Sequence, residues 1–563
     1  MILNFYTKIN NNYIKYYIIY NNKYDSKKDL IKKILSRDFK YKIYDLPIIK
    51  NYIEIGPKIS FKTTWCSNII EIFKRSGIEN IERIEYSTLY EINEKNINYD
   101  KMLYEIYPHD NYFYNQIRNI KKGNDIEYFE VNNIEDFNRE YSLGFDDFDI
   151  KYYTYFFTKL NRNPTNIELH DLSQCNSEHA RHWFFNALLI NDGIEENESL
   201  LKKIKLTSFN NTNSLVSFKD NASIIKGNYS YTLITDFNTK LLYKDLKYIN
   251  FSYKAETHNF PTGICPFPGA GTGVGGRIRD TLCVGKGGDI IAGTAGYCVG
   301  DIDSNDDYNF VLNKPLTILI EASNGASDYG NKIGEPIIQG FCRSFRGYYL
   351  IKNENSNNRN LERIEWLKPI MFSGGIGKVY DYNCIKNKPS FGNIIVRIGG
   401  PAYKIGLGGG TASSRKQEDK NKNSDFNAVQ RGDPGMANKL VRFIRIINDL
   451  NFDYKIIESI HDQGSGGMAN VTREICEPNG GKIWMDKVDI GDNSMNLLEK
   501  WICEYQEQIT FLCNIESLQL IKNISYMENI PLRIIGYINN SKKLTVNNSE
   551  NLNVNNSENL NVN

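Results

Sequence analysis

Four of the six histidines in the sequence lie in segments whose residue types could support catalysis. His179 and His182 lie three residues apart in the segment 176–183, so on a helix they would share one face. An imidazole titrates near neutral pH, and one of the pair could polarise a substrate or carry a proton. A metal pair would need a third ligand at metal spacing, and none stands nearby. For this segment alone, a structural histidine at a helix end stays open as the alternative.

A second segment, 254–261, places a lysine, a carboxylate, a histidine and an amide within six residues. Lys254 could meet a phosphate as a point charge. Glu256 could hold Mg²⁺, a hard cation that prefers oxygen ligands. His258 and Asn259 follow directly. The structural alternative is a polar strand end.

Five glycines are spread over the segment 269–276, and Arg277, Arg279 and Asp280 come directly after it. Repeated glycine would let backbone N–H groups approach phosphate oxygens, so we expect a Gly-rich turn at a nucleotide site. The segment lacks the GK[ST] ending of a Walker loop, and it does not open a βαβ unit as a dinucleotide fingerprint would. Its position just after 254–261 favours the nucleotide interpretation.

Three further polar, Gly-containing segments lie at 408–414, 430–434 and 461–467. Asp462 follows an apolar run and precedes a flexible turn, which is where a metal-binding carboxylate at a strand end would lie. The alternative is a solvated turn residue. The segment 504–507 is by itself typical of a helix surface.

Regular elements must position these segments, and the hydrophobic pattern indicates which ones. In the N-terminal part, strand-like runs at 13–20, 52–61 and 81–92 accompany an amphipathic helix at 63–77 that ends at Gly77. This pattern is typical of helices packed on a sheet.

Residues 146–205 are expected to be mostly helical. Beyond them, strand-like runs alternate with Gly-rich turns and helices, which predicts an α/β or α+β fold with mixed sheets. The expected strands are 230–238, 289–300, 316–323, 393–400 and 454–462, and the expected helix is 434–450.

The composition limits the class of protein. A length of 563 residues corresponds to about four domains. With 68 Lys and Arg against 67 Asp and Glu, no overall field favours nucleic acid or an anionic membrane, and neither is expected as a partner. The sequence shows no transmembrane run and no secretory pattern at its start. Ten scattered cysteines without a CxxC pair are expected to be reduced, so we expect a cytoplasmic protein.

The last residues differ from the rest of the chain. The octapeptide NNSENLNV occurs at 547–554 and again at 555–562. A polar repeat cannot bury a core, so 546–563 is expected to be disordered.

Taken together and in this order, the motifs resemble those of the large, single-chain form of phosphoribosylformylglycinamidine synthase. The resemblance runs from about residue 50 to about residue 540. It rests on EIGPKISFKTTWCSN, DLSQCNSEHARHWFFNA, YKAETHNFPTGICPFPGAGTGVGGRIRD, ASNGASDYGNKIGEPIIQGF, KPIMFSGGIG, GGPAYKIGLGGGTASS, AVQRGDPGM, HDQGSGGMANV and EYQEQ.

The resemblance implies a fold of the α+β and α/β classes, with one half that is similar to aminoimidazole ribonucleotide synthetase. The linker histidine would be delivered to the ATP-binding domain from outside it. The implied domains are an N-terminal α+β module at 1–145, a helical linker at 146–205, an ATP-binding synthetase domain at 206–395, a C-type synthetase domain at 396–545 and the tail at 546–563.

The family converts formylglycinamide ribonucleotide, ATP and glutamine into formylglycinamidine ribonucleotide, ADP, phosphate and glutamate in de novo purine biosynthesis. The resemblance implies that ATP phosphorylates the substrate amide oxygen and that ammonia then displaces the phosphate. Phosphoryl transfer depends mainly on positioning and charge neutralisation, which suits the polar segments found here. ATP and Mg²⁺ are the implied cofactors.

The resemblance also implies roles for single residues. His179 and His258 would be catalytic. Mg²⁺ would be held by Glu256, Asp280 and Asp462. ATP would be contacted by His182, Lys254, Gly269, Ala270, Gly271, Thr272, Gly273, Val274, Gly275, Gly276, Arg277, Ile278, Arg279 and Asp280. The ribonucleotide would be contacted by Thr257, Asn259, Arg279, Gln430, Glu504, Tyr505 and Gln506.

Two departures from the family pattern bear on function. Ala180 stands where the family commonly has Cys, and we expect a packing adjustment without loss of chemistry, because alanine holds a helix well. The sequence also shows no second synthetase half and no glutaminase with its Cys, His and Glu. Ammonia would then come from a glutaminase outside this chain. The exposed sheet of the ATP-binding domain would pair with a second synthetase half or with another copy.

Two other hypotheses stay open at this point. The chain could be a non-catalytic or incomplete ATP-binding half that completes another chain, although its intact histidines argue against this. It could also apply the same chemistry to another substrate, as aminoimidazole ribonucleotide and selenophosphate synthetases do. Those relatives lack the linker motif at 176–183.

Overall fold

The structure of the protein is a computed structural model with side chains. The chain forms two compact units, Met1–Asp125 with Ile490–Asn496, and Ile126–Asp489 with Leu497–Asn563. The structure describes every residue except 1, 11, 22–26, 39, 93–96, 98, 120–128, 178–184, 237–238, 240, 304–311, 353–358, 415–421, 506, 548–559 and 563.

The first unit is an antiparallel sheet with helices packed on it, in the strand order β3-β1-β2-β5-β4-β6. Helix α2 begins after Thr63, whose hydroxyl accepts the N–H of Cys66, and Gly77 adopts a positive φ just beyond its end. The strands and the helix expected here are confirmed. The elements are β1 Ile2–Ile9, β2 Asn12–Tyr20, α1 Lys28–Leu35, β3 Ile43–Tyr44, β4 Tyr52–Pro57, α2 Thr64–Arg75, β5 Ile81–Glu91, β6 Tyr104–Tyr107 and α3 Tyr112–Ile117.

The second unit opens with short helices. Helices α5 and α6 both begin with a capping box, formed by Asp146 with Asp149 and by Thr165 with Glu168, which fixes where each helix starts. The expectation of a mostly helical region is met, apart from one short hairpin. The elements are α4 Ile134–Tyr141, α5 Asp147–Lys159, α6 Asn166–Cys175, β7 Ile190–Asn191, β8 Ile194–Glu195 and α8 Leu200–Leu206.

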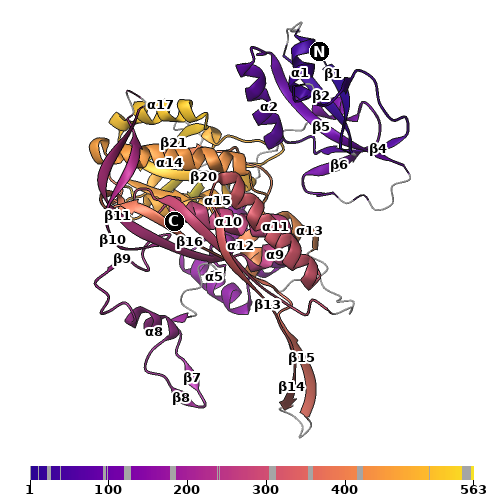
Figure 1. Ribbon diagram of the computed structural model, residues 1–563. Helices are drawn as coiled ribbons and strands as arrows, with labels where there is room; N and C mark the ends of the chain where they lie inside the picture. The colour runs from indigo at the N-terminus through magenta and orange to yellow at the C-terminus, as the bar shows by residue number, and fades with distance from the viewer. Residues whose placement is uncertain are drawn as a thin grey trace. The chain divides into compact units, whose positions relative to one another are not determined.

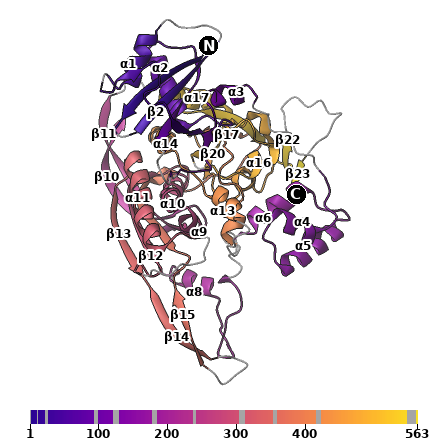
Figure 2. The ribbon, with the colours of Figure 1, turned by 90° about the vertical axis from the view of Figure 1, so that its right-hand side faces the viewer.

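A mixed six-stranded sheet follows, in the order β13-β12-β16-β11-β10-β9, in which only β12 and β13 run parallel. Helices α9, α10 and α11 lie against one face of this sheet in both views (Figure 1, Figure 2). The elements are β9 Ser214–Val216, β10 Ser223–Thr235, β11 Leu242–Thr257, α9 Asn259–Ile264, α10 Pro266–Leu282, β12 Asp289–Val299, α11 Pro315–Ile333, β13 Ile337–Ser344, β14 Arg346–Lys352, β15 Arg359–Glu365 and β16 Ile370–Tyr380.

The Gly-rich segment is a helix and not a turn, which corrects the sequence prediction. It forms most of α10, so the interior N–H groups bond to carbonyls of the preceding turn. Its glycines allow close packing instead. A Cβ on Gly271 would lie 3.3 Å from the carbonyl oxygen of Gly325 in α11, and one on Gly275 would lie 2.8 Å from the ring of Tyr329. The clustered glycine therefore indicates helix contact rather than a phosphate-binding turn.

The run 316–323 is also helical, where the sequence predicted a strand. It belongs to α11, which starts with Pro315 in its first turn, a favoured place for proline. Ile318, Ala322 and Ala326 recur every four residues and are buried. A short apolar run does not separate a buried helix from a strand, and only the longer period decides.

The last part of the chain folds around a second sheet, in the order β18-β20-β17-β21-β19-β22-β23. The helix expected at 434–450 and the strand expected at 393–400 are confirmed as α14 and β17. Of the strand expected at 454–462, Ser459–Asp462 is present as β18. The elements are β17 Ile394–Gly399, α12 Gly409–Ser414, α13 Lys422–Ala428, α14 Pro434–Tyr454, β18 Ser459–Asp462, α15 Gly467–Cys476, β19 Gly481–Trp484, α16 Leu497–Ile502, β20 Gln508–Cys513, α17 Leu518–Glu528, β21 Leu532–Ile538, β22 Leu544–Asn547 and β23 Leu560–Val562.

One hydrophobic core joins the two sheets of the second unit. Buried residues of α10 and α11 share it with residues of α14 and of strands β17, β18 and β20. Because these elements pack on one another, residues of α10 and of β18 can meet in one site.

Part of the Asn-rich tail is outside the described residues. Within the tail, β22 ends at Asn547 and Leu560–Val562 pairs with it as β23, where the sequence predicted disorder. Leu560 and Val562 lie two residues apart and therefore share one face of this strand. None of the described helices is long and apolar enough to span a bilayer.

Candidate functional site

Strand β11 carries Lys254 and Glu256 on the sheet face that α10 covers. Residues two apart share a face, so Thr257 lies on the opposite, exposed face. Beyond the strand, Asn259 accepts the N–H of Met371 with Oδ1 at 2.9 Å, which fixes its side chain beside β16.

The ring of His258 is held by the first turn of α10. Its Nδ1 lies 2.6 Å from the carbonyl oxygen of Gly269, and a carbonyl can only accept, so Nδ1 carries the proton. In the neutral ring Nε2 is then the basic nitrogen.

Two carboxylates from distant parts of the chain meet near β11. Lys254 Nζ lies 2.7 Å from Asp280 Oδ2, and Arg279 Nε lies 3.8 Å from Asp462 Oδ2. Asp462 ends strand β18, as expected for a carboxylate at a strand end. The side-chain amide of Asn221 joins them, donating to Asp280 Oδ1 at 3.0 Å and to Asp462 Oδ1 at 2.7 Å. We refer to these five residues with Glu256 as the acid cluster.

The acid cluster is electrostatically unfavourable as it stands. Burial raises the pKa of Glu256 to about 7, and Asp280 adds to this effect while Lys254 opposes it. Burial and the negative charge of Asp280 also raise the pKa of Asp462. Glu256 Oε2 is buried, and none of the residues that the structure describes forms a hydrogen bond with it. A bound cation would relieve this concentration of buried negative charge.

Arg279 has the features of an anion-binding residue. It is only 4% exposed, and its Nε and Nη1 form no hydrogen bond with any described residue. A buried guanidinium with unused donors suits a carboxylate or a phosphate. The ligand contact that the resemblance implies for Arg279 stays a prediction.

Arg277 is placed differently. It is completely buried, and it donates through Nη1 and Nη2 to the carboxylate of Glu335 and through Nε to Ser373 Oγ at 3.4 Å. The other residues of α10 implied in ATP binding are buried too, namely Gly269, Ala270, Gly271, Thr272, Gly273, Val274, Gly275, Gly276 and Ile278. We expect this stretch to support the site by packing.

A second polar cluster surrounds Glu504. Its Oε1 accepts the N–H groups of Gly410 at 2.9 Å and Gly466 at 3.3 Å, and its Oε2 accepts from Gln430 Nε2 at 2.8 Å. Burial raises the pKa of Glu504 to about 7, and these hydrogen bonds act in the opposite direction. Glu504, Tyr505 and Glu507 are therefore no helix surface, because all three are buried in the connection between α16 and β20.

The neighbours of Glu504 are also buried. Tyr505 is 6% exposed and donates its hydroxyl to the carbonyl oxygen of Lys500 at 2.6 Å. Tyr329 donates to Glu507 Oε1 at 2.9 Å, and burial raises the pKa of Glu507 to about 7. The sequence did not single out Glu507, although it lies in the same polar run.

The linker helix α6 docks on the last part of the chain. Gln174 Nε2 donates to Thr411 Oγ1 at 2.8 Å, Ser173 contacts the same hydroxyl, and Arg473 pairs with Asp171. Gln174 Oε1 is buried, and no residue in the described part of the chain forms a hydrogen bond with it. These residues precede the histidine motif, and the sequence analysis did not single them out.

Four residues of the sequence analysis lie outside the described residues, namely His179, Ala180, His182 and Gln506. Within the part of the chain that is described, no three His, Cys, Asp or Glu side chains are arranged to hold a metal ion. The donor set of the acid cluster still suits Mg²⁺, because it is made of carboxylates and contains the unpartnered Glu256 Oε2.

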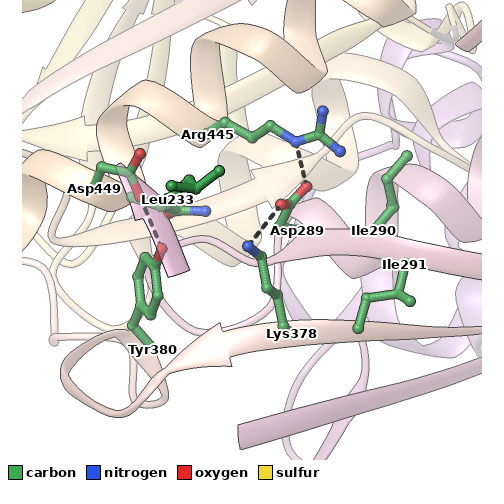
Figure 3. A pocket seen from close by; sticks show the side chains of 9 residues that line it. Leu233, Asp289, Ile290, Ile291, Lys378, Tyr380, Arg445 and Asp449 are labelled. Carbon is green, nitrogen blue, oxygen red and sulfur yellow. Dashed lines mark hydrogen bonds and ion pairs between the residues drawn. The ribbon is translucent and has the colours of Figure 1, made fainter. Parts of the chain in front are cut away.

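A separate cavity of about 430 Å³ lies between α14 and strands β10, β12 and β16 (Figure 3). In it, Asp289 accepts from Arg445 Nε at 2.7 Å and lies 3.5 Å from Lys378 Nζ, while Tyr380 donates to Asp449 at 2.9 Å. Asp289 thus pairs with both cations of the cavity, and the cavity shares no residue with the acid cluster.

Two family models match the chain. One, described as AIR synthase related protein, C-terminal domain, matches residues 391–547. The other, described as formylglycinamide ribonucleotide amidotransferase linker domain, matches residues 134–182.

Curated proteins match over most of the chain. It is 41% identical over 522 residues to the probable phosphoribosylformylglycinamidine synthase, chloroplastic/mitochondrial, of Arabidopsis thaliana, which covers 88% of this chain and 36% of the relative. It is 41% identical over 520 residues to phosphoribosylformylglycinamidine synthase of Dictyostelium discoideum (86% and 37%) and 37% identical over 525 residues to that of Homo sapiens (88% and 38%). The chain thus spans somewhat over a third of the length of these relatives.

Among solved structures, PurL of Thermotoga maritima complexed with FGAR aligns with a TM-score of 0.49 at 21% identity, over 70% of this chain and 53% of that one. The curated relatives and the linker model agree with the motifs of the sequence. Over most of its length this chain is therefore similar to the phosphoribosylformylglycinamidine synthases.

Proposed function

We propose that this chain carries out the amidine-forming step of its family, the ATP-dependent conversion of formylglycinamide ribonucleotide to formylglycinamidine ribonucleotide in de novo purine biosynthesis. The observation that supports this most directly is the acid cluster. It combines the cations Lys254 and Arg279 with buried carboxylates. Phosphoryl transfer needs both, since cations neutralise phosphate oxygens and carboxylates hold the metal that accompanies ATP.

In the proposed reaction, the amide oxygen of the substrate takes the γ-phosphoryl group of ATP, and ADP leaves. Ammonia then attacks the activated carbon, the C–O bond breaks, and phosphate departs with the electron pair. Lys254 and Arg279 would neutralise charge on the transferred group. His258 keeps its proton on Nδ1, so its Nε2 could accept a proton from the attacking ammonia. His179 is proposed as the second catalytic histidine, with His182 near ATP.

The ribonucleotide is proposed to lie against the cluster around Glu504. Gln430 Oε1 is buried and has no hydrogen-bond partner among the described residues, and a substrate hydroxyl could supply a donor. Asn259, Arg279, Tyr505 and Gln506 are the further proposed contacts. Thr257, on the other face of the sheet, is the least supported of them.

Mg²⁺ is proposed to be held by Glu256, Asp280 and Asp462. When bound, it would neutralise phosphate charge. The protein's own part is to keep these carboxylates together before ATP arrives, at the cost expressed in the raised pKa of Glu256.

The test is ADP formation by the purified chain with ATP, MgCl₂, ammonium chloride and formylglycinamide ribonucleotide. We expect ADP release that depends on the ribonucleotide and on ammonium. His179→Ala should lower the rate more than it lowers ATP affinity. Lys332→Ala, a change at an exposed ion pair, is the control and should leave both unchanged.

The second candidate is a non-catalytic or incomplete half that binds ATP and needs a partner. The exposed sheet face favours a partner, because Tyr231 and Leu233 on β10 are 62% and 68% exposed. A folded chain that binds ATP without turnover, and gains turnover when a second synthetase half is added, would select this candidate. The ammonia is proposed to come from a glutaminase outside this chain.

The domain limits at 145, 205, 395 and 545 are also proposals, as is the cytoplasm as the compartment. The linker and C-terminal family models, at 134–182 and 391–547, support two of the domains.

A further inference from the structure

Asn221 lies in the loop between β9 and β10, far in sequence from both acids that it contacts. Its Nδ2 donates to Asp280 Oδ1 at 3.0 Å and to Asp462 Oδ1 at 2.7 Å. Asp280 belongs to α10, which packs on the sheet that contains β11. Asp462 ends β18, which belongs to the sheet that contains β20. One neutral amide therefore donates hydrogen bonds to two carboxylates that come from different parts of the second unit.

The orientation of this amide is set by its other end. Lys386 Nζ donates to Asn221 Oδ1 at 3.3 Å and pairs with Asp220 Oδ1 at 2.6 Å. Asp220 Oδ2 accepts the N–H of Gly285 at 2.9 Å. A lysine can only donate, so the oxygen of Asn221 must face Lys386 and its NH₂ group must face the acids.

The second carboxylate oxygen of each acid faces a cationic side chain. Asp280 Oδ2 faces Lys254, and Asp462 Oδ2 lies near Arg279. Without a shared donor, two close carboxylates would repel each other. A cation in place of Asn221 would compete with a bound metal, whereas an amide holds both carboxylates without adding charge.

We propose that Asn221 is a positioning residue that fixes the separation of Asp280 and Asp462 and so prepares them to share one divalent cation with ATP. This rests on the proposed function. Groups that orient metal ligands contribute to affinity in this way, and losing one costs about 10–100-fold in metal binding.

The experiment measures the thermal unfolding midpoint of the full chain against MgCl₂ concentration, with ATP present. Asn221→Ala should raise the MgCl₂ concentration for half-maximal stabilisation about tenfold. Lys386→Gln keeps the amide of Asn221 but removes the ammonium group that orients it. This variant should raise the same MgCl₂ concentration by a smaller factor. Asn228→Ala, an exposed asparagine on the adjoining strand, should give none.

The inference is wrong if Asn221→Ala, folded as judged without MgCl₂, responds to MgCl₂ as the wild type does. If this variant does not fold, Lys386→Gln serves as the test instead. The inference is then overturned if Lys386→Gln needs the same MgCl₂ concentration for half-maximal stabilisation as the wild type. A wild-type chain without any MgCl₂ response contradicts the proposed metal site as well. The two failures are therefore distinguishable.

Discussion

Arg277 in α10 and Glu335, directly after α11, form a completely buried ion pair in which both Nη atoms of the guanidinium donate to the carboxylate. Removing one partner of such a pair leaves a buried charge uncompensated, which costs about 3–5 kcal/mol. Arg277→Ala should therefore lower the free energy of unfolding by about that amount, as measured by urea denaturation.

The exposed pair of Lys332 and Asp328 on α11 provides the control. Lys332→Ala should change the free energy of unfolding by less than about 0.5 kcal/mol. If instead Arg277→Ala leaves stability unchanged and weakens ATP binding, Arg277 contacts the nucleotide and the supporting role assigned here to the pair is wrong.

Gly325 in α11 lies directly against α10, so that a Cβ there would overlap the carbonyl oxygen of Phe267. The obstacle is backbone and cannot rotate away. Gly325→Ala should therefore destabilise the chain by about 3 kcal/mol, although alanine favours a helix. Ser323→Ala, at an exposed position of the same helix, should be neutral or slightly stabilising. Equal melting temperatures for the two variants would contradict the helix-packing role of the Gly-rich segment.

Glu504 makes stability depend on pH. Its pKa in the folded chain is raised to about 7, so the folded state holds a proton that the unfolded state releases at lower pH. This stabilising contribution is present in acid and is lost as the pH rises toward about 7. Glutamine does not titrate, so Glu504→Gln removes this pH-dependent decrease in the free energy of unfolding. Relative to wild type, the free energy of unfolding of the variant should therefore rise by about 1–3 kcal/mol between about pH 5 and pH 8.

A glutamine at position 504 can still accept the N–H groups of Gly410 and Gly466, and Gln430 can turn its unpartnered oxygen toward the new NH₂ group. Thermal unfolding of wild type and Glu504→Gln at the lower and the upper end of this pH range measures the difference in stability. Glu516→Gln, at an exposed position, is the control. Parallel pH profiles of wild type and Glu504→Gln would show that Glu504 titrates normally.

Local pattern was enough to foresee some of the site. Asp462 was expected at a strand end because an apolar run precedes it, and it ends β18. The Gly-rich segment was expected to form a turn and is a helix, since glycine permits both turns and close helix contacts. Asn221 carries no local signal at all. It joins acids 59 and 241 residues away, and only the packing of the two sheets brings them together.

The sheet that contains β10 and β11 has an exposed face on the side opposite α10. On β10, Tyr231 and Leu233 alternate with the less exposed Thr232 and Ile234, and Phe251 and Tyr253 extend the same face on β11. Such an apolar face is costly in water, so we expect the chain to self-associate through it or to bind a second synthetase half. Leu233→Asp should lower the dimer fraction in sedimentation velocity, because dimerisation would bury the new charge.

Leu206→Asp, an exposed position on α8, is the matched control and should leave the dimer fraction unchanged. A decrease in both variants would point to a general effect of added charge. A wild-type chain that stays monomeric at every concentration tested would exclude self-pairing. The second half would then remain as the partner, and Leu233→Asp should weaken its binding in a pull-down with that half.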